Sequence, residues 1–301
     1  MNVDLVMPVT HFPKLGETVL CATDYLSRTG GKGANQAVAA ARAGGKVAMV
    51  GKVGDDSFGR RCINNLKSQS VWTAGIGVSE RPTGCATIAV DSKGGNFVMV
   101  APGANLDVTA DQAPDEVLNN KHVVLTQLEV TPEATFDVLA RARKNGATTI
   151  LNASPAHSLP RDVLKNVDYL IVNELEAQQL AHSLGIEGND PHVLARGLAA
   201  LGPLTCIITL EARGCVAARG QDVFAQETLQ VEVVDTTGAG DAFCGIFASC
   251  LLKGLPWTEA LHRASAGASL SCLGLGAQAG IPFSEDIDAA AAKLPMAQKI
   301  S

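Results

Sequence analysis

A glycine-rich turn that carries two acidic residues joins a strand-like run to a very apolar segment. Residues 233–252 read VVDTTGAGDAFCGIFASCLL, with Asp235 at the end of the strand-like run and Asp241 at the start of the apolar segment. The first N–H groups of a helix lack partners and carry partial positive charge, so they attract anions, and the small residues of Gly238–Gly240 allow close approach. A carboxylate beside a bound phosphate is repelled by it. General-base catalysis would explain Asp241, because the carboxylate could accept the proton of a hydroxyl that attacks phosphorus.

Two structural explanations of the same turn remain open on local sequence alone. Asp241 could simply complement the helix dipole, because acidic residues are frequent in the first turn of helices. Thr236 or Thr237 could instead cap the helix through its hydroxyl group. The turn by itself therefore does not decide between a catalytic and a structural carboxylate.

A second glycine cluster precedes an alanine-rich helical pattern. Residues 29–45 read TGGKGANQAVAAARAGG, and the last two glycines are a typical end of a helix. The segment lacks the GxxxxGK[ST] pattern of a Walker A loop, and Gln36 stands where the last glycine of GxGxxG would be, so dinucleotide binding is disfavoured. What remains is an open backbone turn with two donors, Lys32 and Asn35, which suit the hydroxyl groups of a polar ligand.

A third polar pair follows a strand-like run at residues 168–173. In VNELEAQQL, Asn173 and Glu176 lie three residues apart on one face of the expected helix. Hard oxygen ligands of this type suit Mg²⁺ that is held largely through water. The alternative is a capping box, in which the two residues satisfy the helix start and bind no metal.

The elements that must position these residues alternate between strand-like and helical patterns. Near-continuous Val, Ile and Leu runs separated by helical segments indicate a parallel sheet covered on both faces. Because ligands of such sheets bind at the carboxyl ends of the strands, Glu129, which follows one of these runs, is a further candidate. The expected strands are residues 47–51, 122–127, 148–152, 168–173 and 205–210.

Two regions break this alternation. Residues 3–27 have an extended pattern, and residues 85–101 have the pattern of a hairpin with its turn at residues 94–96. Neither contains a helical segment. Small antiparallel pieces that project from an α/β body often form a lid over a site, although a surface hairpin without function is the alternative.

Composition excludes several classes of protein. Of the 301 residues, 47% are hydrophobic and 18% are charged, which predicts a globular α/β chain with a sizeable core. The net charge of −6 disfavours nucleic-acid binding. No apolar run is long enough to span a membrane, and the N-terminus lacks the pattern of a signal peptide. The eight cysteines and six histidines show no metal-ligand spacing, so we expect a reducing, cytoplasmic location.

Two long motifs together resemble the ribokinase (pfkB-type) family of carbohydrate kinases. The motifs are GGKGANQAVAAARAGG and VDTTGAGDAFCG, and shorter agreements are FPKLGET, GKVGDDSFG, QLE, VNELEA and GAQ. The resemblance implies a three-layer αβα core with a mostly parallel sheet, formed by residues 28–84 and 102–301. It also implies a small β-sheet lid, formed by residues 3–27 and 85–101, through which two copies pair as a homodimer.

The family resemblance also implies an activity and its residues. The expected reaction is ATP-dependent phosphorylation of the primary (5-) hydroxyl of D-ribose to ribose 5-phosphate, with Asp241 as the base and Gly238, Ala239 and Gly240 as the anion hole. The implied sugar-binding residues are Asn2, Asp4, Gly31, Lys32, Gly33, Asn35, Glu129 and Asp241. The implied ATP-binding residues are Asn173, Thr209, Leu210, Glu211, Ala212, Arg213, Gly214, Gly240 and Ser265. The implied cation ligands are Asn173 and Glu176 for Mg²⁺, and Asp235, Thr237, Ser271, Gly274, Gly276 and Gly280 for an activating K⁺.

Other activities remain open. A polar pocket built to pair several hydroxyls rejects sugars that lack one, which favours ribose over deoxyribose. A nucleoside kinase would need apolar or aromatic surface for a base, and the chain is only 4% aromatic. The alternatives are therefore a kinase for deoxyribose, another pentose or a nucleoside. A sugar- or nucleotide-binding protein with little turnover is a third interpretation, which the retained Asp241 disfavours.

The chain departs from the family pattern at three places. Family members usually have a core strand ending in Gly-Ser before the segment written here NVDLVM, whereas Met1 stands in that place. We therefore expect the first strand to be absent, and stability and sugar affinity to be lower than with that strand. Glu211 stands where the family often has glycine, and Ser265 where relatives have a larger polar residue. Both bear on the preference for the phosphate donor.

Overall fold

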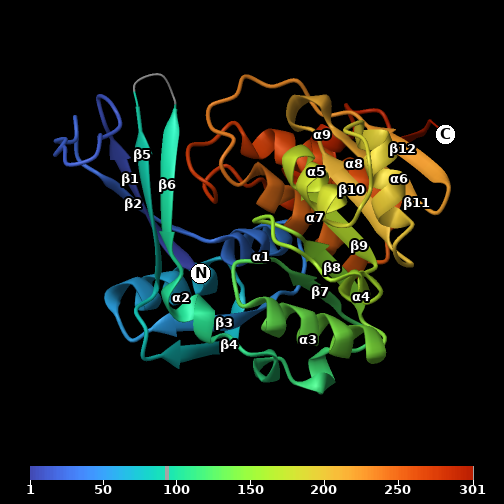
Figure 1. The fold of residues 1–301 in the computed structure, drawn as a ribbon, viewed down its shortest axis with the longest axis horizontal. Helices are drawn as coiled ribbons and strands as arrows, with labels where there is room; N and C mark the ends of the chain where they lie inside the picture. Colours follow the sequence, from blue (N-terminus) through green and yellow to red (C-terminus); the bar gives the residue numbers. More distant parts are fainter. Residues whose placement is uncertain (92–94, 301) are drawn as a thin grey trace.

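A computed structural model describes residues 1–91 and 95–300 and has a layered α/β body with a small sheet projecting from it (Figure 1). The strands are β1 (Asn2–Pro8), β2 (Leu26–Gly30), β3 (Ala48–Gly54), β4 (Trp72–Ser79), β5 (Gly84–Val90), β6 (Asn96–Ala101), β7 (Val123–Thr126), β8 (Thr148–Asn152), β9 (Tyr169–Asn173), β10 (Thr205–Thr209), β11 (Cys215–Arg219), β12 (Asp222–Gln226) and β13 (Gln298–Lys299). The helices are α1 (Lys32–Arg42), α2 (Ser57–Ser68), α3 (Pro132–Lys144), α4 (Arg161–Leu164), α5 (Glu174–Ser183), α6 (Pro191–Ala199), α7 (Ala239–Leu252), α8 (Trp257–Ser271) and α9 (Ser284–Ala291).

The main sheet has seven strands in the order β13-β12-β11-β10-β9-β8-β7. The strands β7, β8, β9 and β10 are mutually parallel, and β11, β12 and β13 extend the sheet with antiparallel pairs. The five predicted strands are confirmed, with bounds that differ by a few residues. The strand-like run before Asp235, residues 231–234, is not a strand. Strands β4, β11, β12 and β13 lie outside the predicted set, because their sequences lack the near-continuous Val, Ile and Leu runs of the central strands.

Strands β3 and β4 form a separate parallel pair. In the described residues, β3 pairs only with β4, and β7 pairs only with β8, so each presents one unpaired edge. The core strands are therefore divided between two sheets rather than joined in one.

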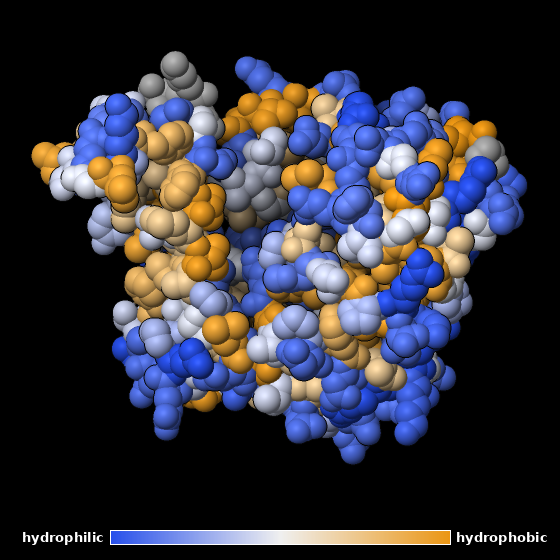
Figure 2. Space-filling model, viewed as in Figure 1, coloured by the Kyte–Doolittle hydropathy of each residue, from blue (hydrophilic) through white to orange (hydrophobic). Residues whose placement is uncertain are grey.

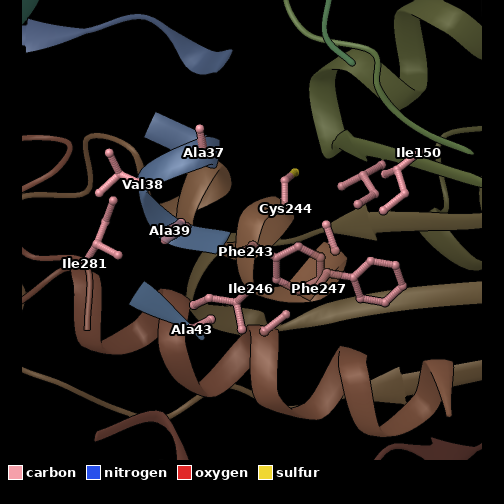
Figure 3. Packing of buried hydrophobic residues seen from close by; sticks show 14 of the residues in the cluster. Ala37, Val38, Ala39, Ala43, Ile150, Phe243, Cys244, Ile246, Phe247 and Ile281 are labelled. Atoms are coloured by element: carbon pink, nitrogen blue, oxygen red, sulfur yellow. The ribbon is translucent and has the colours of Figure 1, made fainter. Parts of the chain in front are cut away.

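Helices cover both faces of the main sheet because its buried strands alternate between two apolar clusters. In β9, Tyr169 and Ile171 face the cluster built by α1, α7 and α8, whereas Leu170 and Val172 face the cluster built by α5 and α6. Figure 3 shows Phe243, Ile246 and Phe247 of α7 between the sheet and the neighbouring helices. This arrangement is the predicted three-layer αβα core.

Helix α7 is buried almost all round, which explains its unusually apolar sequence. It packs closely on α1: a Cβ atom built on Gly245 would lie 2.3 Å from the backbone oxygen of Gln36. Only glycine permits that approach. The starts of α1 and α7, each preceded by a glycine turn, are therefore brought together.

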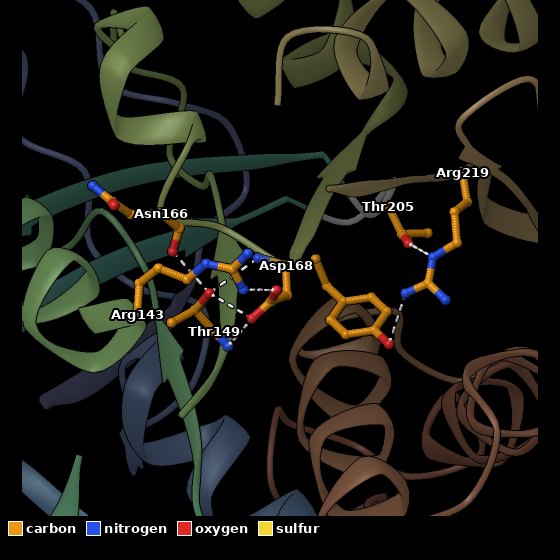
Figure 4. A network of polar contacts seen from close by, with 7 residues as sticks. Arg143, Thr149, Asn166, Asp168, Thr205 and Arg219 are labelled. Carbon is orange, nitrogen blue, oxygen red and sulfur yellow. Dashed lines mark hydrogen bonds and ion pairs between the residues drawn. The ribbon is translucent and has the colours of Figure 1, made fainter. Parts of the chain in front are cut away.

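Polar contacts hold the amino ends of the parallel strands. Asp168, just before β9, accepts hydrogen bonds from the backbone and hydroxyl of Thr149 at 2.9 and 3.1 Å and pairs with Arg143 (Figure 4). At the neighbouring strand, Arg219 Nε donates to Thr205 Oγ1 at 2.7 Å. These contacts leave the opposite, carboxyl ends of the strands to the functional residues.

The projecting sheet, called here the clasp sheet, has the order β2-β1-β5-β6. Strand β1 is antiparallel to β2 and parallel to β5, and β6 pairs antiparallel with β5. Part of the turn predicted at residues 94–96 lies outside the described residues. The base of the clasp sheet enters the body where Asn2 pairs with Gly30 and with Gly84.

Candidate active site

Helix α7 begins in the glycine turn without a side-chain cap. Gly238 is the N-cap residue, and its φ of 80° lies in the left-handed region that glycine favours. The Thr237 N–H donates to Asp235 Oδ1 at 2.9 Å, and no side chain accepts a hydrogen bond as a cap of α7 in the described structure. Capping by Thr236 or Thr237 is therefore wrong as an explanation of this turn.

The turn combines free donors with open space. The Ala239 N–H donates to the Thr236 carbonyl at 3.1 Å, whereas the N–H groups of Gly240 and Asp241 have no acceptor within the described part of the chain. Gly240 is exposed, and a Cβ atom built on it would meet no atom within 4 Å. Unpaired amides at a helix start beside free space can receive an anion.

Asp241 lies where the exposed turn gives way to the buried helix. The residue is 7% exposed, and its carboxylate accepts hydrogen bonds from Asn35 Nδ2 on Oδ2 and from Gln36 Nε2 on Oδ1, both at 2.9 Å. Burial raises the pKa of the carboxyl above its ordinary value, although the Lys32 charge and the two amide donors oppose this effect. Each oxygen retains a lone pair that can accept a substrate proton.

Strand β1 brings two predicted sugar-binding residues to this place. Asn2 and Asp4 are two positions apart and therefore point to the same side of the strand. Asn2 is buried, and its Oδ1 accepts a hydrogen bond from Asn105 Nδ2 at 2.9 Å. The Asp4 carboxylate lies over Gly30, where a Cβ atom would come within 2.1 Å of Asp4 Oδ2 and would displace it.

The carboxylate of Asp4 has no hydrogen-bond donor among the described residues. Burial raises its pKa to about 6, and the charges of Glu129 and Asp241 add to this effect. A half-buried carboxylate without a donor is costly, so the hydroxyl groups of a ligand would stabilise it.

The first glycine turn is filled by protein atoms. Gly31 is the N-cap residue of α1 with a φ of 88°, and a Cβ atom there would lie 2.9 Å from the Asn2 nitrogen. The next amide, Lys32 N–H, donates to Glu129 Oε2 at 2.8 Å. A Cβ atom on Gly33 would come within 3.1 Å of Met49 Cε. Protein atoms therefore occupy the first amide of this turn and the space beside its glycines, although the N–H groups of Gly33 and Ala34 have no acceptor among the described residues.

Sequence reasoning missed a set of amide side chains around Asp241. Gln36 follows Asn35 directly in the motif. Two consecutive amide side chains at a helix start can donate to the two oxygens of one carboxylate, so this adjacency could have identified Gln36. Gln127 and Asn152 follow or end strands β7 and β8, at the sheet edge where ligands were expected. Gln278 lies in the loop after α8 and is the last residue of the quoted GAQ segment, which was the signal for it. Asn105, in the short 3-10 helix Gly103–Asp107, bonds Asn2 and gave no signal.

On the predicted nucleotide side, Asn173 and Glu176 form the capping box of α5. Asn173 Oδ1 accepts the Glu176 N–H at 2.7 Å, and Glu176 Oε2 accepts the Asn173 N–H at 2.9 Å. The capping box, which was the structural alternative to a magnesium site for this pair, is thus observed. The negative charge of Glu176 also contributes to raising the pKa of the Cys244 thiol, after burial and the Asp241 charge, so α5 begins near the first turns of α7.

The predicted nucleotide loop lies beside this capping box, because β10 pairs with β9 and places Thr209 opposite Asn173. Glu211 adopts a φ of 53°, in the left-handed region, at the position where the family often has glycine. Arg213 pairs with Glu174 at the start of α5. In the same loop, Leu210 is buried and Ala212 is exposed. A Cβ atom on Gly214 would come within 2.0 Å of the Gln226 backbone oxygen.

Ser265 is set apart from the exposed part of this loop. It is 4% exposed within α8, and its Oγ lies 3.7 Å from the buried Cys215 Sγ. The structure therefore places Ser265 in the packed interior beneath β11, and its role towards adenine stays a prediction.

The predicted cation residues gather in the loops that flank the turn. Asp235 Oδ2 accepts the Gly276 N–H at 2.8 Å. Burial disfavours the Asp235 anion, but the donors from Thr237 and Gly276 outweigh it and keep the pKa of this carboxyl below its usual value. A Cβ atom on Gly280 would lie 2.0 Å from the Ser271 oxygen, and one on Gly274 would lie 2.5 Å from the Gly280 Cα. Such close backbone contact fits a cation held mainly by carbonyl oxygens.

No group of three or more His, Cys, Asp and Glu side chains that could hold a metal occurs in residues 1–91 and 95–300. A magnesium ion at Glu176 would thus depend on one carboxylate together with water and a phosphate ligand. Glu176 Oε1 accepts no hydrogen bond from the described residues, which leaves it available for that purpose. No helix in the described residues has the length and apolarity needed to cross a membrane.

The αβα body, the turn with unpaired N–H groups and the buried carboxylate behind it form an arrangement that suits phosphoryl transfer. Figure 2 shows the surface hollowed between the clasp sheet and this body. Residues 1–284 match the family model described as pfkB family carbohydrate kinase. The chain belongs to the pfkB family of carbohydrate kinases.

Similar proteins agree with this assignment. The ribokinase of Bacillus subtilis is 38% identical over 290 residues, with 95% of each chain covered. A deoxyribokinase of Salmonella typhi is 34% identical over 294 residues, which cover 95% of this chain and 94% of that one. The crystal structure of the ribokinase of Thermotoga maritima superimposes with a TM-score of 0.89 at 31% identity, and that of the Arabidopsis thaliana ribokinase complexed with ribose and ATP with a TM-score of 0.87 at 28% identity. Each comparison covers 96% of both chains.

Proposed function

We propose that the protein transfers the γ-phosphoryl group of ATP to the 5-hydroxyl of D-ribose. The observation that carries this proposal is the buried Asp241 carboxylate, which has two amide donors and lies directly behind an open turn with unpaired N–H groups. Phosphoryl transfer depends on positioning and on charge stabilisation, and this arrangement offers both.

Different residues of the proposed site bind the sugar, accept its proton and stabilise the phosphoryl group. The unpaired carboxylate of Asp4, with Asn2 and Glu129, accepts ring hydroxyls, and the Lys32 ammonium and Asn35 amide donate. Asp241 takes the proton of the primary hydroxyl as its oxygen attacks phosphorus. The free amides at Gly240 and Asp241 stabilise the negative charge of the phosphoryl oxygens.

Two cations complete the proposal. Glu176, oriented by Asn173, would hold Mg²⁺, which neutralises charge on the ATP phosphates. Asp235, Thr237, Ser271, Gly274, Gly276 and Gly280 would hold K⁺, whose charge would steady the glycine turn. ATP would lie along Thr209–Gly214.

We further propose that the clasp sheet is a lid, formed by residues 3–27 and 85–101 over a core of residues 28–84 and 102–301. Apolar side chains lie exposed on this sheet, and Figure 2 shows them on the left of the molecule. They include Phe97 and Met99 of β6, which are 54% and 56% exposed. Leu15 and Leu20, in the segment between β1 and β2, are 108% and 85% exposed. Pairing with a second copy would cover them, giving a homodimer. The eight free cysteines support a reducing, cytoplasmic location.

Deoxyribose is a second candidate substrate, because the deoxyribokinase of Salmonella typhi is nearly as similar as several ribokinases. The decisive experiment is a coupled assay with ATP against ribose, deoxyribose, fructose and adenosine, each with and without K⁺. We expect the highest kcat/KM for ribose and a gain with K⁺. Turnover of deoxyribose above that of ribose would replace the first candidate by the second, and no turnover of any sugar would refute the kinase assignment.

A further inference from the structure

Two chains of side-chain amides converge on Asp241, one on each carboxylate oxygen. In the shorter chain, Gln127 donates to Gln36 Oε1, and Gln36 Nε2 donates to Asp241 Oδ1 at 2.9 Å. Gln36 Nε2 also donates to Asn152 Oδ1 at 3.1 Å. The Gln36 side chain is therefore held at both of its ends.

The longer chain runs through Gln278, in the loop after α8. Asn65 Nδ2 of α2 donates to Gln278 Oε1 at 2.7 Å. Gln278 Nε2 then donates to Asn35 Oδ1 at 2.9 Å, and Asn35 Nδ2 donates to Asp241 Oδ2 at 2.9 Å. Thr29 Oγ1, in clasp strand β2, donates to the same Gln278 Oε1 at 3.4 Å. One amide thus connects the clasp sheet, α2 and α1 to the carboxylate.

In both chains of hydrogen bonds, each amide donates to the next group on the way to Asp241. A side-chain amide has one acceptor and one donor end, so whichever end a neighbour occupies decides what the other end offers. Because Gln278 donates to Asn35 Oδ1, Asn35 can present only its NH₂ group to Asp241. The carboxylate accordingly meets donors on both oxygens, which favours its ionised form and fixes its rotation.

The loop that carries Gln278 is itself held in place. Arg42 Nη1 donates to the backbone oxygens of Gln278 and Ile281 at 2.8 and 2.7 Å. Arg42 Nε donates to Gln69 Oε1 at 2.8 Å, and the guanidinium lies 5.1 Å above the centre of the Phe283 ring. Gln278 is therefore fixed through its main chain as well as through its amide.

We propose that Gln278 is a positioning residue for phosphoryl transfer: it orients the Asn35 amide so that Asp241 always faces a donor, and it links the catalytic carboxylate to the clasp sheet. The inference rests on the proposed function of Asp241 as base. Gln278 itself touches no reacting atom, and its effect passes through Asn35.

Other charged and titratable groups also face Asp241 and affect the pKa of its carboxyl. They are Lys32 from α1, which favours the anion, Glu129 from the segment after β7 and Asp4 from β1, which disfavour it, and the Cys244 thiol on α7 itself. Because none of them lies in the Gln278 loop, a change at Gln278 leaves their charges in place.

The test compares Gln278→Glu with Gln278→Met. A carboxylate at position 278 has no donor for Asn35 Oδ1, so the Asn35 amide turns and places its oxygen against Asp241 Oδ2. We expect kcat at saturating ribose to fall ~10-fold for Gln278→Glu and less for Gln278→Met, with the acid limb of the kcat profile moved to higher pH in the same order. Ribose affinity at pH 8, measured by calorimetry, should fall for Gln278→Glu, because the turned Asn35 amide no longer donates to the sugar, and should change less for Gln278→Met. Residual ribose binding and an unchanged Tm show that each variant is folded.

Gln112→Met is the matched control. Gln112 is half-buried like Gln278, but its amide bonds join Gly51 and Thr109 away from the site. Its kcat and pH profile should equal those of the unmodified protein. If the unmodified protein is active and both Gln278 variants keep its pH profile, the positioning role is refuted and the kinase function stands. If the unmodified protein phosphorylates no sugar, the proposed function fails first.

Discussion

The two glycine turns of this protein have similar sequences and opposite uses. Each precedes a helix that becomes buried from its third residue on, and each has a glycine with positive φ at its N-cap, Gly31 or Gly238. At the first turn the Lys32 amide is bonded to Glu129, whereas at the second turn the Gly240 amide is free and faces open space. The two turns therefore differ in the free space beside them, and only the second leaves room at its exposed glycine for the anion proposed above.

The largest expected effect comes from removing the carboxylate at the open turn. Asp241→Asn should lower kcat ~10²-fold or more, because the proposed acceptor of the hydroxyl proton is lost, and ribose should still bind. A coupled assay and calorimetry measure the two quantities. Asp222→Asn, in β12, where the carboxylate pairs with Lys299 of β13, serves as control and should be fully active. An active Asp241→Asn variant would show that the open turn works without a base.

Within the open turn, two glycines should respond differently. A methyl group at Gly240 projects into free space, so Gly240→Ala should lower kcat ~10-fold or more by crowding the anion while Tm stays unchanged. Gly238 has a φ of 80°, and a Cβ atom there would lie 2.8 Å from the Ala277 backbone, so Gly238→Ala should lose about 1–3 kcal/mol of stability. Equal losses of Tm in both variants would contradict the distinction between open and packed positions.

The filled turn should respond to substitution in stability and sugar affinity. Gly31→Ala forces a methyl group to within 2.9 Å of the Asn2 nitrogen at a φ of 88°, and should cost about 1–3 kcal/mol. Because Asn2 shifts, the KM for ribose should rise, and kcat should change less than in Gly240→Ala. Denaturant unfolding and steady-state kinetics give these values. A large fall in kcat at unchanged KM would mean that the first turn also contacts the phosphoryl group.

The smallest effect is a pH dependence beside the filled turn. The pKa of Asp4 is raised from 3.8 to about 6, so its protonated form contributes stability that is present below pH 3.8 and is lost as the pH rises through about 6. Asp4→Asn should therefore gain stability relative to the unmodified protein from acid to neutral pH. Ribose affinity should increase through about pH 6 in the unmodified protein, as Asp4 becomes an acceptor, and should stay low and constant in Asp4→Asn. Parallel stability curves for the two proteins would refute this assignment.

Much of the architecture was predictable because it depends on local patterns. The apolar runs predicted β7, β8, β9 and β10 nearly to the residue, and two helices were predicted to start at glycine turns. The capping box at Asn173 and Glu176 was visible as an alternative, since its partners are only three residues apart. The division of the core strands into two sheets, and the strands β11 and β12, depend on pairing between distant segments and were not predicted.

The sequence by itself determined the two glycine turns, the carboxylate at the second of them and the apolar helix behind it. Only the tertiary structure decided which groups hold that carboxylate. Asn35 and Gln36 are 206 and 205 positions from Asp241 in the chain, and Gln278 reaches it through Asn35. They meet because Gly245 lets α7 pack directly on the backbone of α1, and hydrogen bonds between side chains depend on such packing rather than on the pattern of either helix alone.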